Sequence, residues 1–423
     1  MNTILAGPVL GRLNPGARIH RVALTLICVC TLLCSCAVLP PQLPGGPEPR
    51  TPREFTDYLQ RIVDAGDPPG LGFVALDRSG VLYSKGFGRT GPEGAPAMTT
   101  GHVFQWWSLT KIFTAVAVLQ LEERGLLALS DPVAKHLDFF QVRDAGAKDP
   151  VIRIEHLLDH SSGLPDVGSD ILSWVHFEGD PHPHQTQLIR EHLPRYNRVG
   201  FPAGREASYT NIGYMLLAAV IESVSGLSYA EYIQASILDP LDMRDTGFVY
   251  NEALLRRDAG GSHPRDLMSL ILPFYIDMDR AVRTRREGRI WFRPIYADQQ
   301  GSTGLIGTPD DLAVFLRALL NDGRYPGGRI LSSSSVRRMG QPGAQLRSGP
   351  FKGMSMGPGW FIDETPEGVS LSHAGAGAAF VCMMRLYPEE GRSYIIMANS
   401  TYLGRSMGGD ILDRAARIDW KLP

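Results

Sequence analysis

The chain has 423 residues, a formal net charge of −2 and 43% hydrophobic residues. This length and apolar content can supply a large hydrophobic core and suggest two to three domains or subdomains. The weak charge bias argues against a nucleic-acid-binding protein, because such proteins carry a clear basic excess. Since long polar low-complexity tracts are absent, we expect most of the chain to be folded.

The first fifty residues have the pattern of an export signal and a linker. Basic residues precede an apolar run from 22 to 39, and a Pro- and Gly-rich segment follows. The run ends in Leu-Cys-Ser-Cys-Ala (33–37), which resembles a bacterial lipoprotein box. This implies a signal peptide of residues 1–35, lipidation of Cys36, a linker of residues 36–50 and anchoring in the bacterial cell envelope or periplasm. The alternative is an uncleaved membrane anchor, because the run approaches bilayer-spanning length.

The cysteine pattern excludes a disulfide framework. Four of the five cysteines lie at or before position 36, which leaves Cys382 alone in the remaining chain. Cys382 lies between Val381 and Met383, so we predict a buried small hydrophobic residue and not a nucleophile.

The first elements after the linker are a helix and a hairpin. Residues 51–62 predict a helix with proline in its first turn. Two β-runs, 71–76 and 81–88, flank a turn and predict a β-hairpin. Residues 104–121 then predict a buried helix that begins near Ser108, because the apolar positions recur at helical spacing without Gly or Pro.

Ser108 and Lys111 form the one Ser-x-x-Lys sequence in the chain. They lie one turn apart, and a helix start favours negative charge that develops near Ser108. A lysine can take the serine proton only where its ammonium is desolvated or crowded by cations. The chain has only six lysines, and one falls inside this apolar helix. The alternative is a capping serine beside a lysine that extends to solvent.

The middle of the chain predicts short helices joined by loops. A short helix at 152–158 ends at Ser-Ser-Gly, and residues 181–204 are polar and loop-like. Tyr209-x-Asn211 lies on a loop before a buried helix at 215–224, and another helix begins at 228. Four histidines, His176, His182, His184 and His192, lie in or near the polar stretch. We assign no metal there, because the pattern lacks zinc-site spacing and fits a solvated loop.

Residues 251–300 combine an apolar decapeptide, 267–276, with six arginines between 280 and 293. We predict that these arginines lie on a solvated helical face. The alternative is a site for anionic substrate or lipid headgroups.

The last third of the chain predicts a helix at 308–320, β-runs at 359–362, 369–373, 378–386 and 392–398, and a closing helix at 406–420. Strands at both chain ends imply an α+β fold: an antiparallel sheet flanked by helices, with a mainly helical insert. The predicted domain is 51–423, with 51–125 and 301–423 as its α/β part and about 126–300 as its insert. The seam between the two parts is where a pocket is expected.

Three short motifs together resemble those of the serine β-lactamase and penicillin-binding protein superfamily, specifically its class C-like branch. They are Ser108-x-x-Lys111, Tyr209-x-Asn211 and His373-Ala374-Gly375, with further matches at 157–165, 239–246 and 304–312. The resemblance covers about residues 54–399, and the three motifs occur once each and in the family's order.

The resemblance implies an acyl-enzyme mechanism without metal or cofactor. Ser108 would attack an ester, amide or lactam carbonyl, while Lys111 draws off its proton directly or through Tyr209. Tyr209 would then protonate the leaving group and help to activate the deacylating water. Asn211 would orient the substrate or the lysine.

The family's pattern also implies an oxyanion site between the backbone N–H groups of Ser108 and Ala376. Gly375 beside it would leave room for a substrate carbonyl. His373 departs from the lysine that true β-lactamases and cell-wall transpeptidases carry, and a histidine is about neutral at pH 7. His373 therefore resembles the esterase and D-amino-acid peptidase members.

The function predicted is an exported serine hydrolase that cleaves an ester or amide bond through a Ser108 acyl-enzyme, as an esterase or D-amino-acid peptidase does, with a small molecule or a cell-wall peptide as its substrate. One alternative is a true β-lactamase or penicillin-binding DD-carboxypeptidase, with an arginine of 280–293 as the missing cation. Another is an inactive relative that binds cell-wall peptide.

Overall fold

The computed structural model describes residues 47–144, 151–348, 351–402 and 405–421. The chain divides into two units, Met1–Gln42 and Leu43–Pro423, and only the second contains described residues. The predicted signal peptide, Cys36 and most of the predicted linker therefore lie outside the described residues. The second unit contains the hydrophobic core clusters described below, so it has the core that an independently folding domain needs.

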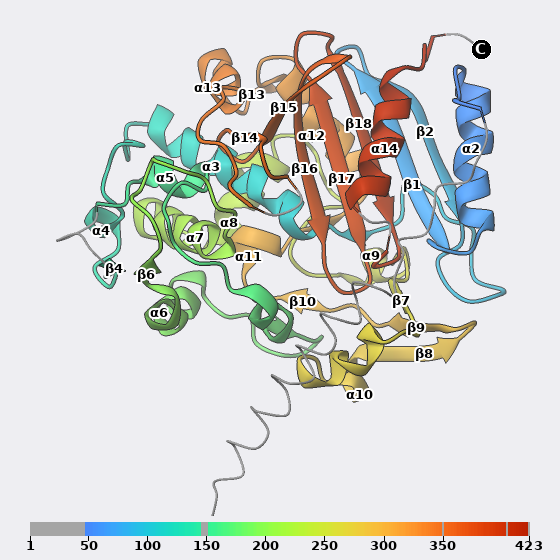
Figure 1. Cartoon of the computed structure of the whole chain (residues 1–423), viewed down its shortest axis with the longest axis horizontal. Helices are drawn as coiled ribbons and strands as arrows, with labels where there is room; N and C mark the ends of the chain where they lie inside the picture. Colours follow the sequence, from blue (N-terminus) through green and yellow to red (C-terminus); the bar gives the residue numbers. More distant parts are fainter. Residues whose placement is uncertain (1–46, 145–150, 349–350, 403–404, 422–423) are drawn as a thin grey trace, which may run out of the picture. The chain divides into compact units, whose positions relative to one another are not determined.

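A seven-stranded antiparallel sheet is formed from the two ends of this unit (Figure 1). Its order is β14-β15-β16-β17-β18-β1-β2, and β1 pairs with β18 from Leu71 opposite Ala398 to Asp77 opposite Arg392. The predicted α+β fold, with one sheet formed from both chain ends, is confirmed. The strands are β1 (Gly70–Asp77), β2 (Val81–Gly88), β14 (Ser355–Met356), β15 (Phe361–Thr365), β16 (Gly368–Ala376), β17 (Val381–Tyr387) and β18 (Arg392–Ala398).

The two faces of the sheet pack against different helices. Along β1, Phe73 and Ala75 belong to a core cluster with residues of α2 (Pro52–Asp64) and α14 (Arg405–Ala416). Val74 and Leu76 belong to a second cluster with α3 (Thr110–Glu123) and α12 (Pro309–Leu320). Side chains alternate along a strand, so these two clusters lie on opposite faces of the sheet. Helices therefore cover both faces (Figure 1).

Helix α3 is buried over its residues from Thr110 to Leu121. It contacts α7 (Asn211–Ser225), α8 (Tyr229–Ile233) and α11 (Gln300–Thr303), which explains why its sequence is apolar on all sides. A 3₁₀ turn, η1 (Trp107–Leu109), precedes it, so Ser108 lies in the turn that leads into the helix. This agrees with the predicted helix start near Ser108.

The prediction of a loop for residues 181–204 is wrong over most of that range, because Gln185–Tyr196 form the helix α6. Leu188, Ile189 and Leu193 share one face and are buried, and α6 packs on α7. This packing outweighs the polar composition and Pro194. The other helical segments before residue 262 are α4 (Val133–His136), α5 (Ile154–Leu158), η2 (Gly168–Ser173), η3 (Gln234–Leu238) and α9 (Glu252–Leu255).

The arginine-rich segment is a small sheet and not the predicted helical face. Its strands β7 (Ser262–Pro264), β9 (Arg289–Phe292) and β8 (Val282–Arg286) lie side by side in that order. Glu287 and Gly288 join β8 and β9 with φ of 53° and 68°, the paired positive values of a two-residue hairpin turn. We call residues 262–293 the basic appendage. It also contains η4 (Met268–Leu270), η5 (Leu272–Phe274) and α10 (Met278–Ala281).

The remaining strands form two-residue pairs: β3 (Phe104–Gln105) with β11 (Ile306–Gly307), β4 (Arg143–Asp144) with β6 (Arg198–Val199), β5 (Val175–His176) with β10 (Tyr296–Ala297), and β12 (Arg324–Tyr325) with β13 (Gly328–Arg329). Helix α13 (Ser333–Met339) follows β13. The predicted insert, 126–300, thus carries short strands besides its helices. In the described ranges no single helix has the length and apolarity to cross a membrane; α7 and Tyr229–Leu238 meet that criterion only as a pair bent by 78°.

Candidate active site

Lys111 and Ser108 are in direct contact. The Lys111 ammonium donates to Ser108 Oγ over 3.1 Å, to Asn211 Oδ1 over 2.8 Å and to the Ser302 carbonyl over 2.9 Å. Its side chain is fully buried. The alternative of a capping serine beside a lysine that extends to solvent therefore does not hold. These three acceptors are neutral oxygens. A buried ammonium that faces neutral acceptors can give up a proton more readily than one paired with a carboxylate.

Asp166 fixes the orientation of Asn211. Asp166 Oδ1 accepts the Asn211 backbone N–H over 2.8 Å and its amide Nδ2–H over 3.1 Å. With the amide nitrogen directed to a carboxylate, the amide oxygen points to Lys111. Sequence reasoning assigned no role to Asp166. The available signal was its position directly after the motif match at 157–165.

Tyr209 lies over the lysine and against a buried histidine. The Lys111 ammonium is 4.9 Å from the centroid of the half-buried Tyr209 ring. The His160 ring centroid lies 4.5 Å from that of Tyr209. The structure therefore brings Lys111, Ser108, Asn211 and Tyr209 together.

His160 is a neutral support for this tyrosine. Its Nδ1 accepts the Thr210 backbone N–H over 3.1 Å, which places the ring proton on Nε2. Burial, together with the nearby Lys111 cation, holds the pKa of His160 well below its usual value. His160 lies within the motif match at 157–165, but its contact with Tyr209 cannot be read from the sequence.

Strand β16 lies against the turn that carries Ser108. A Cβ on Gly375 would stand 2.1 Å from the Trp106 carbonyl oxygen and 3.2 Å from the Ser108 nitrogen, so only glycine fits there. Ala376, the next residue, is exposed at the end of the strand. Trp107 has φ of 47°, which is strained for a bulky residue, and its indole packs where a Cβ on Gly377 would lie.

His373 lies on β16 beside the tyrosine. Its ring is fully buried, 4.9 Å from the Phe361 ring centroid and 6.2 Å from that of Tyr209, and its Nδ1 lies 3.0 Å from the Ala374 carbonyl oxygen. The structure thus places His373 next to Tyr209. Cys36 lies outside the described residues.

Two histidines of the predicted solvated loop, His176 and His182, are in contact with each other, and His176 also contacts a carboxylate. His176 is 7% exposed; its Nδ1 contacts Asp298 over 2.6 Å and its Nε2 contacts His182 Nδ1 over 2.7 Å. The prediction of a solvated loop is therefore wrong for His176, because β5 pairs it with Tyr296. In the part of the chain that the structure describes, no group of three or more His, Cys, Asp or Glu residues is arranged to hold a metal.

Cys382 is buried, as predicted. Its thiol donates to the Gln105 carbonyl oxygen, and burial raises its pKa far above the usual range. It therefore has none of the thiolate character that a nucleophile needs.

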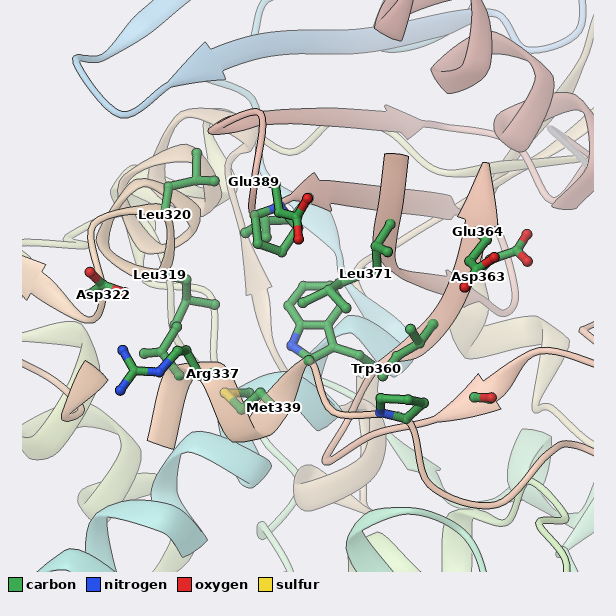
Figure 2. Close-up of a pocket in the computed structure, with 18 of the residues that line it drawn as sticks. Leu319, Leu320, Asp322, Arg337, Met339, Trp360, Asp363, Glu364, Leu371 and Glu389 are labelled. Atoms are coloured by element: carbon green, nitrogen blue, oxygen red, sulfur yellow. The ribbon is translucent and has the colours of Figure 1, made fainter. Parts of the chain in front are cut away.

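A cavity of about 770 Å³ lies away from these motifs (Figure 2). Trp360, Met339 and Leu371 line its apolar part, and charged residues such as Arg337 and Glu389 stand around it. Ser108 and Lys111 are not among its lining residues. We therefore place the candidate active site by the serine–lysine geometry and not by the volume of this cavity.

An antiparallel sheet covered on both faces, with an apposed serine and lysine at the start of a buried helix, defines the β-lactamase/transpeptidase-like class of serine hydrolases. The chain belongs to the Beta-lactamase family, whose model matches residues 55–417. It is accordingly a serine hydrolase. The resemblance inferred from the motifs is confirmed.

Three similar proteins illustrate the relationship. Penicillin-binding protein 4* of Bacillus subtilis (strain 168) is 29% identical over 334 residues, which cover 77% of this chain and 67% of that protein. The octameric penicillin-binding protein homologue from Pyrococcus abyssi superimposes with a TM-score of 0.68 at 26% identity, covering 84% of this chain and 74% of that one. The D-amino acid amidase from Ochrobactrum anthropi SV3 gives 0.68 at 21% identity, covering 85% and 96%. The chain spans about two thirds of the length of the curated relatives that it matches.

Proposed function

We propose that Ser108 is the nucleophile of an acyl-transfer reaction and that Lys111 is its base. The observation that carries this proposal is the 3.1 Å contact between Lys111 Nζ and Ser108 Oγ at a fully buried lysine. In its neutral form Lys111 takes the Ser108 proton as the oxygen attacks a carbonyl carbon. The carbonyl oxygen becomes an oxyanion between the backbone N–H groups of Ser108 and Ala376.

Tyr209 completes the proton path in this proposal. Its ring centroid lies 4.9 Å from the Lys111 ammonium, and we propose that its hydroxyl carries a proton between the lysine and the leaving group. Loss of the leaving group gives the acyl-enzyme on Ser108. Water then attacks the ester carbonyl, and the bond between the acyl carbon and Ser108 Oγ breaks. The proton that the water releases passes through the same residues back to Ser108 Oγ.

We propose small esters or amides, including those of D-amino acids, as substrates. His373 offers no permanent cation for a substrate carboxylate. Of the six arginines at 280–293 that could replace it, three are engaged in ion pairs: Arg280 with Asp180, Arg283 with Asp258 and Arg289 with Asp67. The fold likeness to the D-amino acid amidase supports this substrate class.

A penicillin-binding activity is the second candidate. It is favoured by the 29% identity to a relative named as a penicillin-binding protein. Its weakness is the lack of a lysine at position 373. A third possibility, an inactive relative that binds cell-wall peptide, would leave the buried Lys111 contact without a purpose.

The location is likewise a proposal. We propose export to the bacterial cell envelope and lipidation at Cys36, on the basis of the lipoprotein-like box at 33–37. Metabolic labelling with a radioactive fatty acid tests it in the full chain. Label on the wild type that is absent from Cys36→Ala would support the anchor, whereas label on neither would contradict it.

Intact-mass analysis tests the nucleophile and the substrate class together. The wild type, Ser108→Ala and a control, Ser334→Ala at an exposed serine on α13, are incubated separately with a fluorophosphonate and a penicillin. We expect the fluorophosphonate adduct on the wild type and the control but not on Ser108→Ala. A stable penicillin adduct that depends on Ser108 would support the second candidate. Folded wild type without either adduct would contradict the enzymatic proposal.

A further inference from the structure

The basic appendage carries an exposed apolar tip. Among the described residues nine large apolar side chains are exposed, and four of them fall in residues 267–274. Leu270 is 66% exposed and Phe274 is 76% exposed. Leu272 and Ile276, next to them, are buried in the main core. Two core anchors thus hold a tip, residues 267–274, that turns Leu267, Met268, Leu270 and Phe274 outward, and a cluster of this kind marks an interaction surface.

The same appendage has an excess of positive charge. Residues 262–293 hold seven arginines and four acidic residues, whereas the whole chain has a net charge of −2. Three of the arginines are neutralised by the ion pairs given above. The other four are exposed and have no ion pair with any residue of the described ranges: Arg265, Arg285, Arg286 and Arg293.

The apolar tip and the free arginines lie on one hydrogen-bonded substructure. The Arg265 backbone N–H donates to the Gly288 carbonyl oxygen over 2.8 Å, so the tip begins beside the turn between β8 and β9. Strand β7 pairs with β9, and Arg289 of β9 donates to Asp67 and Ser400, which lie outside the appendage. Figure 1 shows β8, β9 and α10 grouped beyond the end of the large sheet.

We propose that the basic appendage docks on an anionic lipid bilayer, with Leu270 and Phe274 in the boundary between headgroups and acyl chains. Arg285 and Arg286, with the other free arginines, would contact lipid phosphates. Exposed apolar residues beside unpaired basic residues are the composition of interfacial membrane contacts. Attraction of arginine to an anionic surface adds to the apolar insertion.

Other partners fit this surface less well. A second copy of the chain that met it about a twofold axis would bring the same unpaired arginines together, which is repulsive. Nucleic acid would satisfy the arginines but would leave the exposed leucine and phenylalanine without an apolar partner. The proposal depends neither on lipidation at Cys36 nor on the proposed reaction.

Vesicle flotation of the unit that begins at Leu43 tests the proposal, because this unit lacks the apolar N-terminal run. We expect binding to vesicles that contain phosphatidylglycerol and none to phosphatidylcholine alone. Each arginine near an anionic surface strengthens partitioning roughly fivefold, so Arg285→Gln with Arg286→Gln should weaken it about 30-fold. Leu270→Ser with Phe274→Ser should weaken it about tenfold or more.

Matched controls replace exposed residues elsewhere. Arg53→Gln with Arg61→Gln on α2, and Leu227→Ser at a leucine that is 42% exposed, should bind as the wild type does. Circular dichroism checks that each variant is folded. If Ser108 reacts with a fluorophosphonate, labelling of each variant provides a second check. Equal binding by the tip variants and the wild type, or no binding to anionic vesicles, would overturn the proposal. A concentration-dependent dimer that is lost in the tip variant would overturn it in favour of self-association.

Hydrogen exchange of the full chain provides a second measurement that needs no variant. An N-terminal anchor would hold the chain equally on vesicles with and without phosphatidylglycerol, so any difference between the two must come from another part of the chain. We expect peptides within 265–293 to exchange more slowly only on the anionic vesicles, with the main sheet unchanged. Identical exchange of these peptides on both kinds of vesicle would contradict docking by the appendage even if the anchor is present.

Discussion

The Lys111 ammonium lies 2.8 Å from the oxygen of Asn211, and the amide nitrogen of that same side chain donates to Asp166. The carboxylate therefore acts on the lysine through a neutral amide. Direct pairing of Lys111 with a carboxylate would stabilise its charged form and oppose its use as a base. The Asn211 amide, held by Asp166, thus helps to position the ammonium beside Ser108.

Lys111→Arg should remove most of the acylation activity. An arginine keeps the charge but cannot give up its proton, and general bases typically contribute about 10² to 10⁴ in rate. The measurement is the rate of fluorophosphonate labelling. Lys135→Arg, at an exposed lysine paired with Asp131, is the matched control and should react as the wild type does. Labelling of Lys111→Arg at the wild-type rate would contradict the proposed base.

Asp166→Ala should lower kcat by about 10- to 100-fold with little change in KM, because Asn211 loses the hydrogen bonds that orient its amide. Asp166→Asn keeps an oxygen that can accept the same donors, so it should recover most of the activity. A merely structural role would not give this split between kcat and KM. Equal kcat values for the alanine variant and the wild type would exclude the positioning role.

Gly375→Ala should abolish labelling of Ser108, because the added Cβ would stand 2.1 Å from the Trp106 carbonyl and must displace the turn that carries the serine. Gly247→Ala is the control, since a Cβ there meets no atom within 4 Å. Labelling kinetics and a melting curve are measured for both. If Gly375→Ala retains full labelling, β16 does not constrain the serine turn as described.

The local elements of the site could be predicted from the sequence. Helix α3 has an unbroken apolar pattern, and the motifs that carry Ser108, Lys111 and Tyr209 are short and in order. Helix α6 could not be predicted with the same rules, because its stability comes from packing on α7 and not from its composition. The prediction for the arginine-rich segment was wrong for a similar reason. Its charge suggested a solvated helical face, whereas the Glu287-Gly288 turn joins β8 to the buried strand β9 in a hairpin.

The residues that position the site, Asp166 and His160, could not be predicted from the sequence for a different reason. Asp166 and His160 act through contacts with Asn211 and Tyr209, and these contacts join segments 45 to 50 residues apart in the chain. No local pattern encodes such a pairing. The motif match at 157–165 marked the segment but not which of its residues contacts the tyrosine.

His160→Gln should change how stability depends on pH. The pKa of His160 is lowered in the folded state, so the unfolded chain binds its proton first as the pH falls. His160 therefore stabilises the wild type fully above about pH 6.5, and this contribution is lost below it. Glutamine can still accept the Thr210 N–H but does not titrate.

We thus expect His160→Gln to melt below the wild type near neutral pH and the difference to shrink as the pH falls towards about 5. The other histidines are common to both proteins and cancel in the comparison. A difference in melting temperature that stays constant over this range would show that His160 does not titrate on unfolding.

Asp311→Asn should show the opposite pH dependence. Asp311 Oδ2 accepts the Asp245 backbone N–H and the Thr246 hydroxyl, and burial raises the pKa of this carboxyl to about 6. Between the ordinary value near 4 and this raised value, the folded state holds the proton that the unfolded state has released. The free energy of unfolding therefore falls as the pH rises through this window and stays lower above it.

An asparagine at position 311 can accept both hydrogen bonds with its oxygen and has no charge to bury. Relative to the wild type, the melting temperature of Asp311→Asn should rise from about pH 4 to pH 7 and then level off. Asp310→Asn, at the exposed neighbouring carboxylate, is the control and should show a much smaller change. If Asp311→Asn instead loses stability as the pH rises, the carboxylate charge itself must stabilise the junction between the segments 239–246 and 304–312.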